Sequence, residues 1–99
     1  MLGRPLVAAL ALLALHAHAQ ENAAARSLAA TCANCHGTDG HSVTQEVVSL
    51  AGLPKDYLVA QMKAFRDGAR PATIMPQIAK GYSDAQIEAM ADYFSRRPR

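Results

Sequence analysis

The sequence predicts a small all-α domain built from three main helices. Three segments, starting at Asn22, Pro54 and Ser83, have helix-forming composition, helical periodicity or helix-start signals. No stretch shows the alternation of apolar and polar residues that is typical of a half-buried strand. No internal repeat, low-complexity tract or linker divides the chain, so a single helical domain is expected.

The first helix is predicted over Asn22 to Cys32, where residues 23–30 are mostly strong helix formers. It would deliver two cysteines at its C-terminal end, and Gly37 is expected at a turn or a close backbone approach. Residues 41–52 show no convincing period and are expected to be irregular.

The second helix is predicted to open at Pro54, because proline suits the first helical position. Leu58, Met62 and Phe65 then share one apolar face, and Gly68 closes the helix. An irregular loop over residues 69–81 is expected to follow.

The third helix has the clearest start, because Ser83 and Gln86 form a capping-box pattern. Pro98 is expected to end it, and residues 96–99 are expected to form a frayed, solvated end. The residues predicted to form its buried face are Ile87, Met90, Ala91 and Phe94.

Residues 1–19 have the three-part layout of a secretory signal peptide: Arg4, an apolar run from Leu6 to Leu15, and an A-x-A site at Ala17–Ala19. Cleavage after Ala19 would leave residues 20–99 as one domain in the periplasm. An uncleaved anchor is the alternative, but the run is too short to span a bilayer, so no stable membrane insertion is expected. Ten Lys and Arg against eight Asp and Glu give a net charge of only +2, which disfavours a nucleic-acid partner.

Cys32-Ala33-Asn34-Cys35-His36 is the C-x-x-C-H pattern that attaches a c-type haem. Two thiols three positions apart on one helical turn can each form a thioether with a haem vinyl group, and His36 would then be the proximal iron ligand. A thioredoxin-like dithiol needs a βαβ setting that the sequence lacks, and a zinc site needs a second Cys/His pair. One covalently attached haem c is therefore expected at Cys32, Cys35 and His36.

A second axial ligand must come from His41, Met62, Met75 or Met90. Met62 and Met90 lie on apolar helical stripes, and His41 follows His36 too closely to reach around a porphyrin. Met75 is favoured because it lies far along the chain, where Pro76 biases it towards an extended backbone. A thioether ligand raises the potential and suits electron transfer rather than oxygen chemistry. No general acid, base or nucleophile is seen, so no catalytic residue is predicted and an enzyme is not expected.

These residues resemble the class I c-type cytochromes over essentially the whole of residues 20–99. Three stretches are particularly similar to the cytochrome subunit of flavocytochrome c sulfide dehydrogenase, and the first two are also similar to small cytochromes of the c4 type. They are Leu28–Cys32, Ser49–Pro54 with Tyr57 and Leu58, and Arg70–Met75 with Ile78–Asp84. The resemblance implies a class I cytochrome c fold with three main helices around one haem, and Cys32, Cys35, His36 and Met75 as the residues that bind it.

The resemblance also implies a periplasmic electron carrier that accepts electrons from the flavoprotein subunit of a sulfide dehydrogenase. Two other functions stay open: a freely diffusing carrier of the c4 or c553 kind, and a haem-based sensor with an open distal position. The chain departs from the family pattern where Val48 replaces a proline whose carbonyl accepts from the proximal histidine ring. The Val48 carbonyl can still accept that bond.

Overall fold

The computed structural model describes the backbone of residues 3–99, with the side chains of residues 1–4 and 17–22 outside the described set. Within residues 3–99 there is no strand, so the predicted all-α class is confirmed. The elements are α1 (Gly3–Ala30), α2 (Ala33–His36), the 3-10 helix η1 (Thr38–Gly40), α3 (Lys55–Asp67), α4 (Met75–Ala79) and α5 (Asp84–Ser95).

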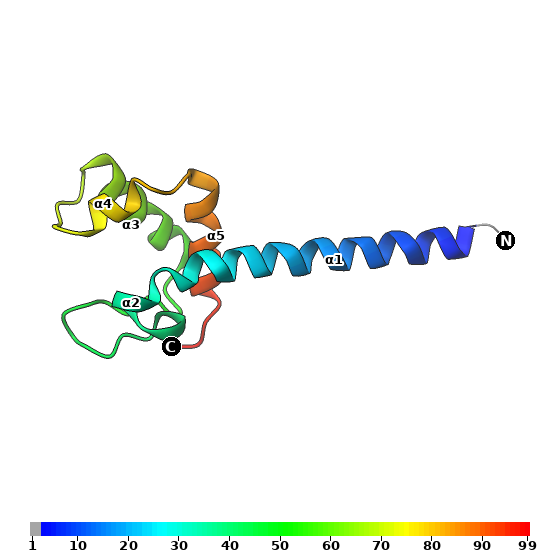
Figure 1. Cartoon of the computed structure of the whole chain (residues 1–99), viewed down its shortest axis with the longest axis horizontal. Helices are drawn as coiled ribbons and strands as arrows, with labels where there is room; N and C mark the ends of the chain where they lie inside the picture. The colour runs from blue at the N-terminus through cyan, green and yellow to red at the C-terminus, as the bar shows by residue number, and fades with distance from the viewer. Residues whose placement is uncertain (1–2) are drawn as a thin grey trace.

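Helix α1 projects far beyond a small body formed by the other helices (Figure 1), and the molecule measures 63 × 27 × 20 Å. Its described apolar side chains between Leu6 and Leu15 are exposed, the large ones by 57–67%. Helix α1 already begins at Gly3, so the predicted start at Asn22 was too late. The Ala- and Leu-rich residues before Asn22 are equally good helix formers. No described helix combines the length and apolar character needed to cross a membrane. The predicted cleavage site at Ala17–Ala19 falls where side chains are not described.

The core forms where the last turns of α1 meet α3 and α5. Ala29, Leu58, Ala91 and Phe94 make one buried cluster, with Leu50, Leu53 and Tyr93 packed against it. All four residues predicted for the buried face of α5 are buried, and Ile87 is fully enclosed. The α3 face is less covered, since Met62 and Phe65 remain half-buried.

The helix boundaries follow local chemistry. The Ser83 hydroxyl accepts from the Gln86 backbone N–H, and the Gln86 side-chain oxygen accepts from the Ser83 N–H, which confirms the capping box. Gly68 adopts the left-handed conformation (φ 82°) that ends α3, as predicted. Pro54 precedes α3 by one residue instead of being its first, and α5 ends at Ser95, before Pro98 is reached.

The frayed end predicted for residues 96–99 is wrong. The His41 ring donates from Nε2 to the Pro98 carbonyl (2.7 Å), so His41 is not merely a solvated loop residue. Arg99 Nε donates to the Gly52 carbonyl (3.4 Å), and the Arg97 guanidinium stacks 4.4 Å from the centre of the Tyr93 ring. The tail is held in place by bonds in both directions: the Pro98 carbonyl of the tail accepts from the segment, and the Gly52 carbonyl of the segment accepts from the tail.

Met75 also differs from its predicted setting. It is the first residue of the short helix α4 and does not lie in an irregular, extended loop. Pro76 is compatible with this start because the first N–H groups of a helix have no intrahelical acceptor, so the missing N–H costs nothing there.

Candidate functional site

The C-x-x-C-H motif occupies a tight turn at the end of α1. The Thr31 and Cys32 N–H groups bond to the carbonyls of Leu28 (3.2 Å) and Ala29 (3.0 Å), and this tightening ends the helix. The Cys35 N–H then bonds to the Cys32 carbonyl (3.3 Å), so the two cysteines lie one turn apart. Both thiols are free. The predicted spacing on a single helical turn is therefore observed, although Cys32 lies in the turn before α2 and not within the first helix.

The two thiols have different surroundings. Cys32 is half-buried and packs against the core cluster of Ala29, Leu58, Ala91 and Phe94. Burial raises the pKa of the Cys32 thiol, since a thiolate is poorly solvated there. Cys35 is exposed. A group joined to both would thus be anchored at the core on one side and open to solvent on the other.

His36 has a defined ring orientation. Its Nδ1 lies 2.7 Å from the Val48 carbonyl oxygen. Because a carbonyl can only accept, Nδ1 must carry a proton, and in the neutral imidazole the Nε2 lone pair is then the one left for a metal. This bond is the one expected of the Val48 carbonyl in spite of the missing proline.

Backbone hydrogen bonds join the two ends of the segment Gly37–Gly52, which contains Val48. The Gly40 carbonyl accepts from the N–H groups of both Leu50 (2.8 Å) and Ala51 (3.2 Å). Gly37 begins the segment at φ 82°, and a Cβ there would collide with the His41 carbonyl. Gly37 is therefore the close-approach glycine that was predicted.

Met75 belongs to a second segment that is fixed to the motif. The Thr31 hydroxyl donates to the Leu28 carbonyl (2.7 Å), which leaves its oxygen to accept from the Tyr82 hydroxyl (2.8 Å). Tyr82 lies three residues after the end of α4, so this bond holds the α4 segment beside the residue that precedes Cys32. The contact joins side chains 51 positions apart, and no sequence pattern pointed to it.

The other candidates for the distal position are placed differently. Met90 is 4% exposed and fills the core, while His41 directs its Nε2 to the Pro98 carbonyl. Met62 and Met75 are both half-buried.

The segment that carries Val48 and the segment that contains α4 both expose apolar side chains. Val43 is 94% exposed, Val48 60%, Ile74 63% and Ile78 38%. Exposed apolar side chains, two free thiols and a histidine whose Nδ1 is already bonded suit a flat apolar group that carries a metal. Among the described residues no cluster of three or more His, Cys, Asp or Glu side chains could hold a bare metal ion.

A family model described as "Cytochrome C oxidase, cbb3-type, subunit III" matches residues 19–94. The chain belongs to this family of c-type cytochromes. Family membership implies a covalently attached haem c. The chain has the all-α class I cytochrome fold.

Several known proteins are similar to this cytochrome. The cytochrome subunit of sulfide dehydrogenase from Chlorobaculum tepidum is 39% identical over 68% of this chain and 60% of its own length. The thiosulfate dehydrogenase electron acceptor of Thiomonas intermedia is 44% identical over 75% of this chain, which spans only 35% of that protein. Cytochrome c-554(548) of Halomonas halodenitrificans is 39% identical over 78% of this chain and 96% of its own.

The structure of Acidithiobacillus ferrooxidans cytochrome c4 is also similar, with a TM-score of 0.62 and 39% identity. That match covers 65% of this chain and 37% of the other. The family predicted from the sequence is therefore confirmed.

Proposed function

We propose that this protein is a periplasmic cytochrome with one haem, which passes electrons by outer-sphere transfer. The observation that carries the proposal is the C-x-x-C-H turn, in which both thiols are free and the His36 ring is oriented by the bond from Nδ1 to the Val48 carbonyl. Cys32 and Cys35 would form the two thioethers, and His36 Nε2 would be the proximal ligand. The bound haem supplies a one-electron redox centre.

Met75 is the distal ligand in this proposal. Two of the four candidates are occupied elsewhere, because Met90 fills the core and His41 bonds to the Pro98 carbonyl. Of the remaining two, Met75 opens the segment that Tyr82 ties to Thr31, next to the motif. Met62 belongs to the middle of α3.

The donor we propose is the flavoprotein subunit of a sulfide dehydrogenase. This rests on the similarity to a protein that is named as the cytochrome subunit of sulfide dehydrogenase. The cytochrome would then take part in sulfide oxidation without performing the sulfur chemistry. A freely diffusing carrier is the second candidate, since cytochrome c-554(548) is matched over 96% of its length.

Residues 1–19 are proposed to be a signal peptide that is cleaved after Ala19. The exposure of the apolar side chains along this part of α1 supports the proposal, because none of the described ones contributes to the core.

The test is a visible absorption spectrum of the protein purified gently from its native host. One haem c per chain is expected, with covalent attachment shown by haem that stays with the denatured polypeptide. Flavin in near-equal amount supports the sulfide dehydrogenase subunit, and haem alone supports the diffusing carrier. A colourless protein from cells that can attach haem c contradicts the proposed function.

A further inference from the structure

The residues after α5 form a contact that the proposed function does not use. We call Arg97–Arg99 the C-terminal strap. It lies against the segment Gly37–Gly52, which carries Val48. The His41 Nε2–H donates to the Pro98 carbonyl (2.7 Å), and Arg99 Nε donates to the Gly52 carbonyl (3.4 Å). The strap thus contacts this segment near its beginning and at its end.

Helix α5 also contacts the segment near both of its ends, through Phe94. The Gly52 N–H donates to the Phe94 carbonyl (2.9 Å). At Gly40 the fit is close, since a Cβ would lie 2.8 Å from Phe94 Cδ1 and 2.9 Å from the Ala51 nitrogen. Both ends of the segment are therefore set by α5 together with the strap.

The middle of the segment has little packing of its own. Val43 and Val48 are 94% and 60% exposed. Side chains that exposed cannot fix the backbone by burial. The Ser42 N–H donates to the Ser49 hydroxyl (3.0 Å) and joins the two arms of the segment, so the position of the Val48 carbonyl depends on this bond and on the fixed ends of the segment. That carbonyl accepts from His36 Nδ1 at 2.7 Å.

We propose that His41 is a positioning residue for His36. By joining the strap to the segment, it keeps the Val48 carbonyl aligned with the His36 ring and so tunes the reduction potential of the haem. Donation of the ring proton makes Nε2 a more basic ligand, which favours the oxidised iron. A weaker bond to Val48 should therefore raise the potential. This inference rests on the proposed function, in which His36 ligates the iron.

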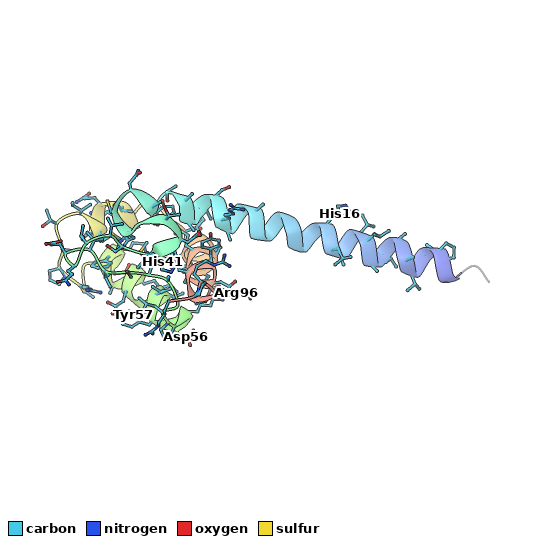
Figure 2. All side chains as sticks on the ribbon, turned by 90° about the horizontal axis from the view of Figure 1, so that it is seen from below. His16, His41, Asp56, Tyr57 and Arg96 are labelled. Carbon is cyan, nitrogen blue, oxygen red and sulfur yellow. The ribbon has the colours of Figure 1, made fainter. Side chains whose placement is uncertain are left out.

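The experiment uses the holoprotein with His41→Ala, and His41→Gln as the variant that keeps a side-chain N–H donor. Arg96→Ala is the matched control, because Arg96 belongs to the same end of the chain but forms its ion pair with Asp92 one turn back on α5 (3.1 Å). Figure 2 labels both: His41 lies within the body, and Arg96 at the end of α5.

Two quantities are measured: the midpoint potential, and the solvent exchange rate of the His36 Nδ1 proton in the reduced protein by NMR. His41→Ala should raise the potential and speed the exchange about fivefold, the factor that corresponds to losing one typical hydrogen bond. His41→Gln should restore much of both, and Arg96→Ala should match the unmodified protein.

Arg99→Ala tests the second strap contact and replaces His41→Ala if that variant does not accumulate. It should shift both quantities in the same direction. If His41→Ala or Arg99→Ala lowers the melting temperature but leaves potential and exchange unchanged, the strap is only structural and the inference is wrong. Absence of haem from the unmodified protein would instead contradict the proposed function.

Discussion

At His36 a backbone carbonyl decides which ring nitrogen is available for chemistry. The Val48 oxygen accepts from Nδ1, so the tautomer with a free Nε2 is fixed before any ligand binds. The residue at position 48 contributes through its backbone, and valine therefore replaces proline without removing the bond. What the replacement removes is backbone stiffness, which the Ser42–Ser49 hydrogen bond and the fixed ends of the segment must supply instead.

Met75→Ala tests whether Met75 is the distal ligand. A thioether ligand raises the potential of a haem iron, so its removal should lower the midpoint potential and change the spectrum of the oxidised protein. Potentiometric titration and visible spectroscopy measure both.

Met62→Ala is the control for that prediction, because Met62 is also half-buried but lies within α3. If Met75→Ala leaves spectrum and potential unchanged while Met62→Ala alters them, the ligand assignment is wrong. If neither variant changes them, a sensor with an open distal position becomes the better description.

Between elements, the Tyr93 side chain joins η1 to α5 by a hydrogen bond. The Tyr93 hydroxyl donates to Asp39 Oδ1 (2.6 Å), and Asp39 is the non-glycine residue that adopts a positive φ (53°) among those described. Such a conformation is strained for most residues, although aspartate tolerates it. The bond therefore holds a turn that lies three residues beyond His36.

Tyr93→Phe should lower the free energy of unfolding by about 1 kcal/mol at neutral pH. The bond to Asp39 raises the pKa of Tyr93 above its ordinary value. A pKa raised on folding gives stability that is fully present below the unfolded pKa, about 10, and is lost as the pH rises through the folded pKa. The difference between the two proteins should thus shrink above about pH 10.

Denaturant unfolding at neutral and alkaline pH measures this difference. Tyr57→Phe is the control, because Tyr57 is 48% exposed on α3 (Figure 2) and should be nearly neutral at both pH values. A Tyr93→Phe effect that is the same at both pH values would mean that packing, and not the hydroxyl, stabilises the turn.

Across the whole molecule, the N-terminal part of α1 stands apart from the body that contains the core (Figure 1). His16 marks this part of the helix in Figure 2, and its ring Nδ1 bonds only within the helix, to the Leu12 carbonyl. The described side chains of residues 5–16 are all exposed, so their removal would uncover no core residue.

The protein recovered from the periplasm should begin at Gln20, as expected if residues 1–19 are removed on export. Intact-mass measurement of the haem-bearing protein tests this directly. Replacing Ala17 and Ala19 together with bulky residues should block processing and retain the longer chain, whereas Ala14→Leu should leave the mass of the product unchanged. A haem-bearing protein that keeps Met1 would contradict the cleavage.

The sequence alone determined the all-α class, the buried face of α5, its capping box and the C-x-x-C-H turn. Each depends on residues within a few positions of one another, where helix periodicity and capping chemistry act directly. The Val48 carbonyl could also be predicted, because a family resemblance supplied the partner.

Tertiary structure alone decided the contacts between distant segments. The Thr31–Tyr82 bond, the Tyr93–Asp39 bond and the return of the strap to His41 span more than 50 positions each. No local propensity encodes such pairs, since they follow from how α1, α3 and α5 pack around a shared core. The extended setting predicted for Met75 failed for a related reason, because the preference imposed by a following proline is weak enough for the α4 turn to override it.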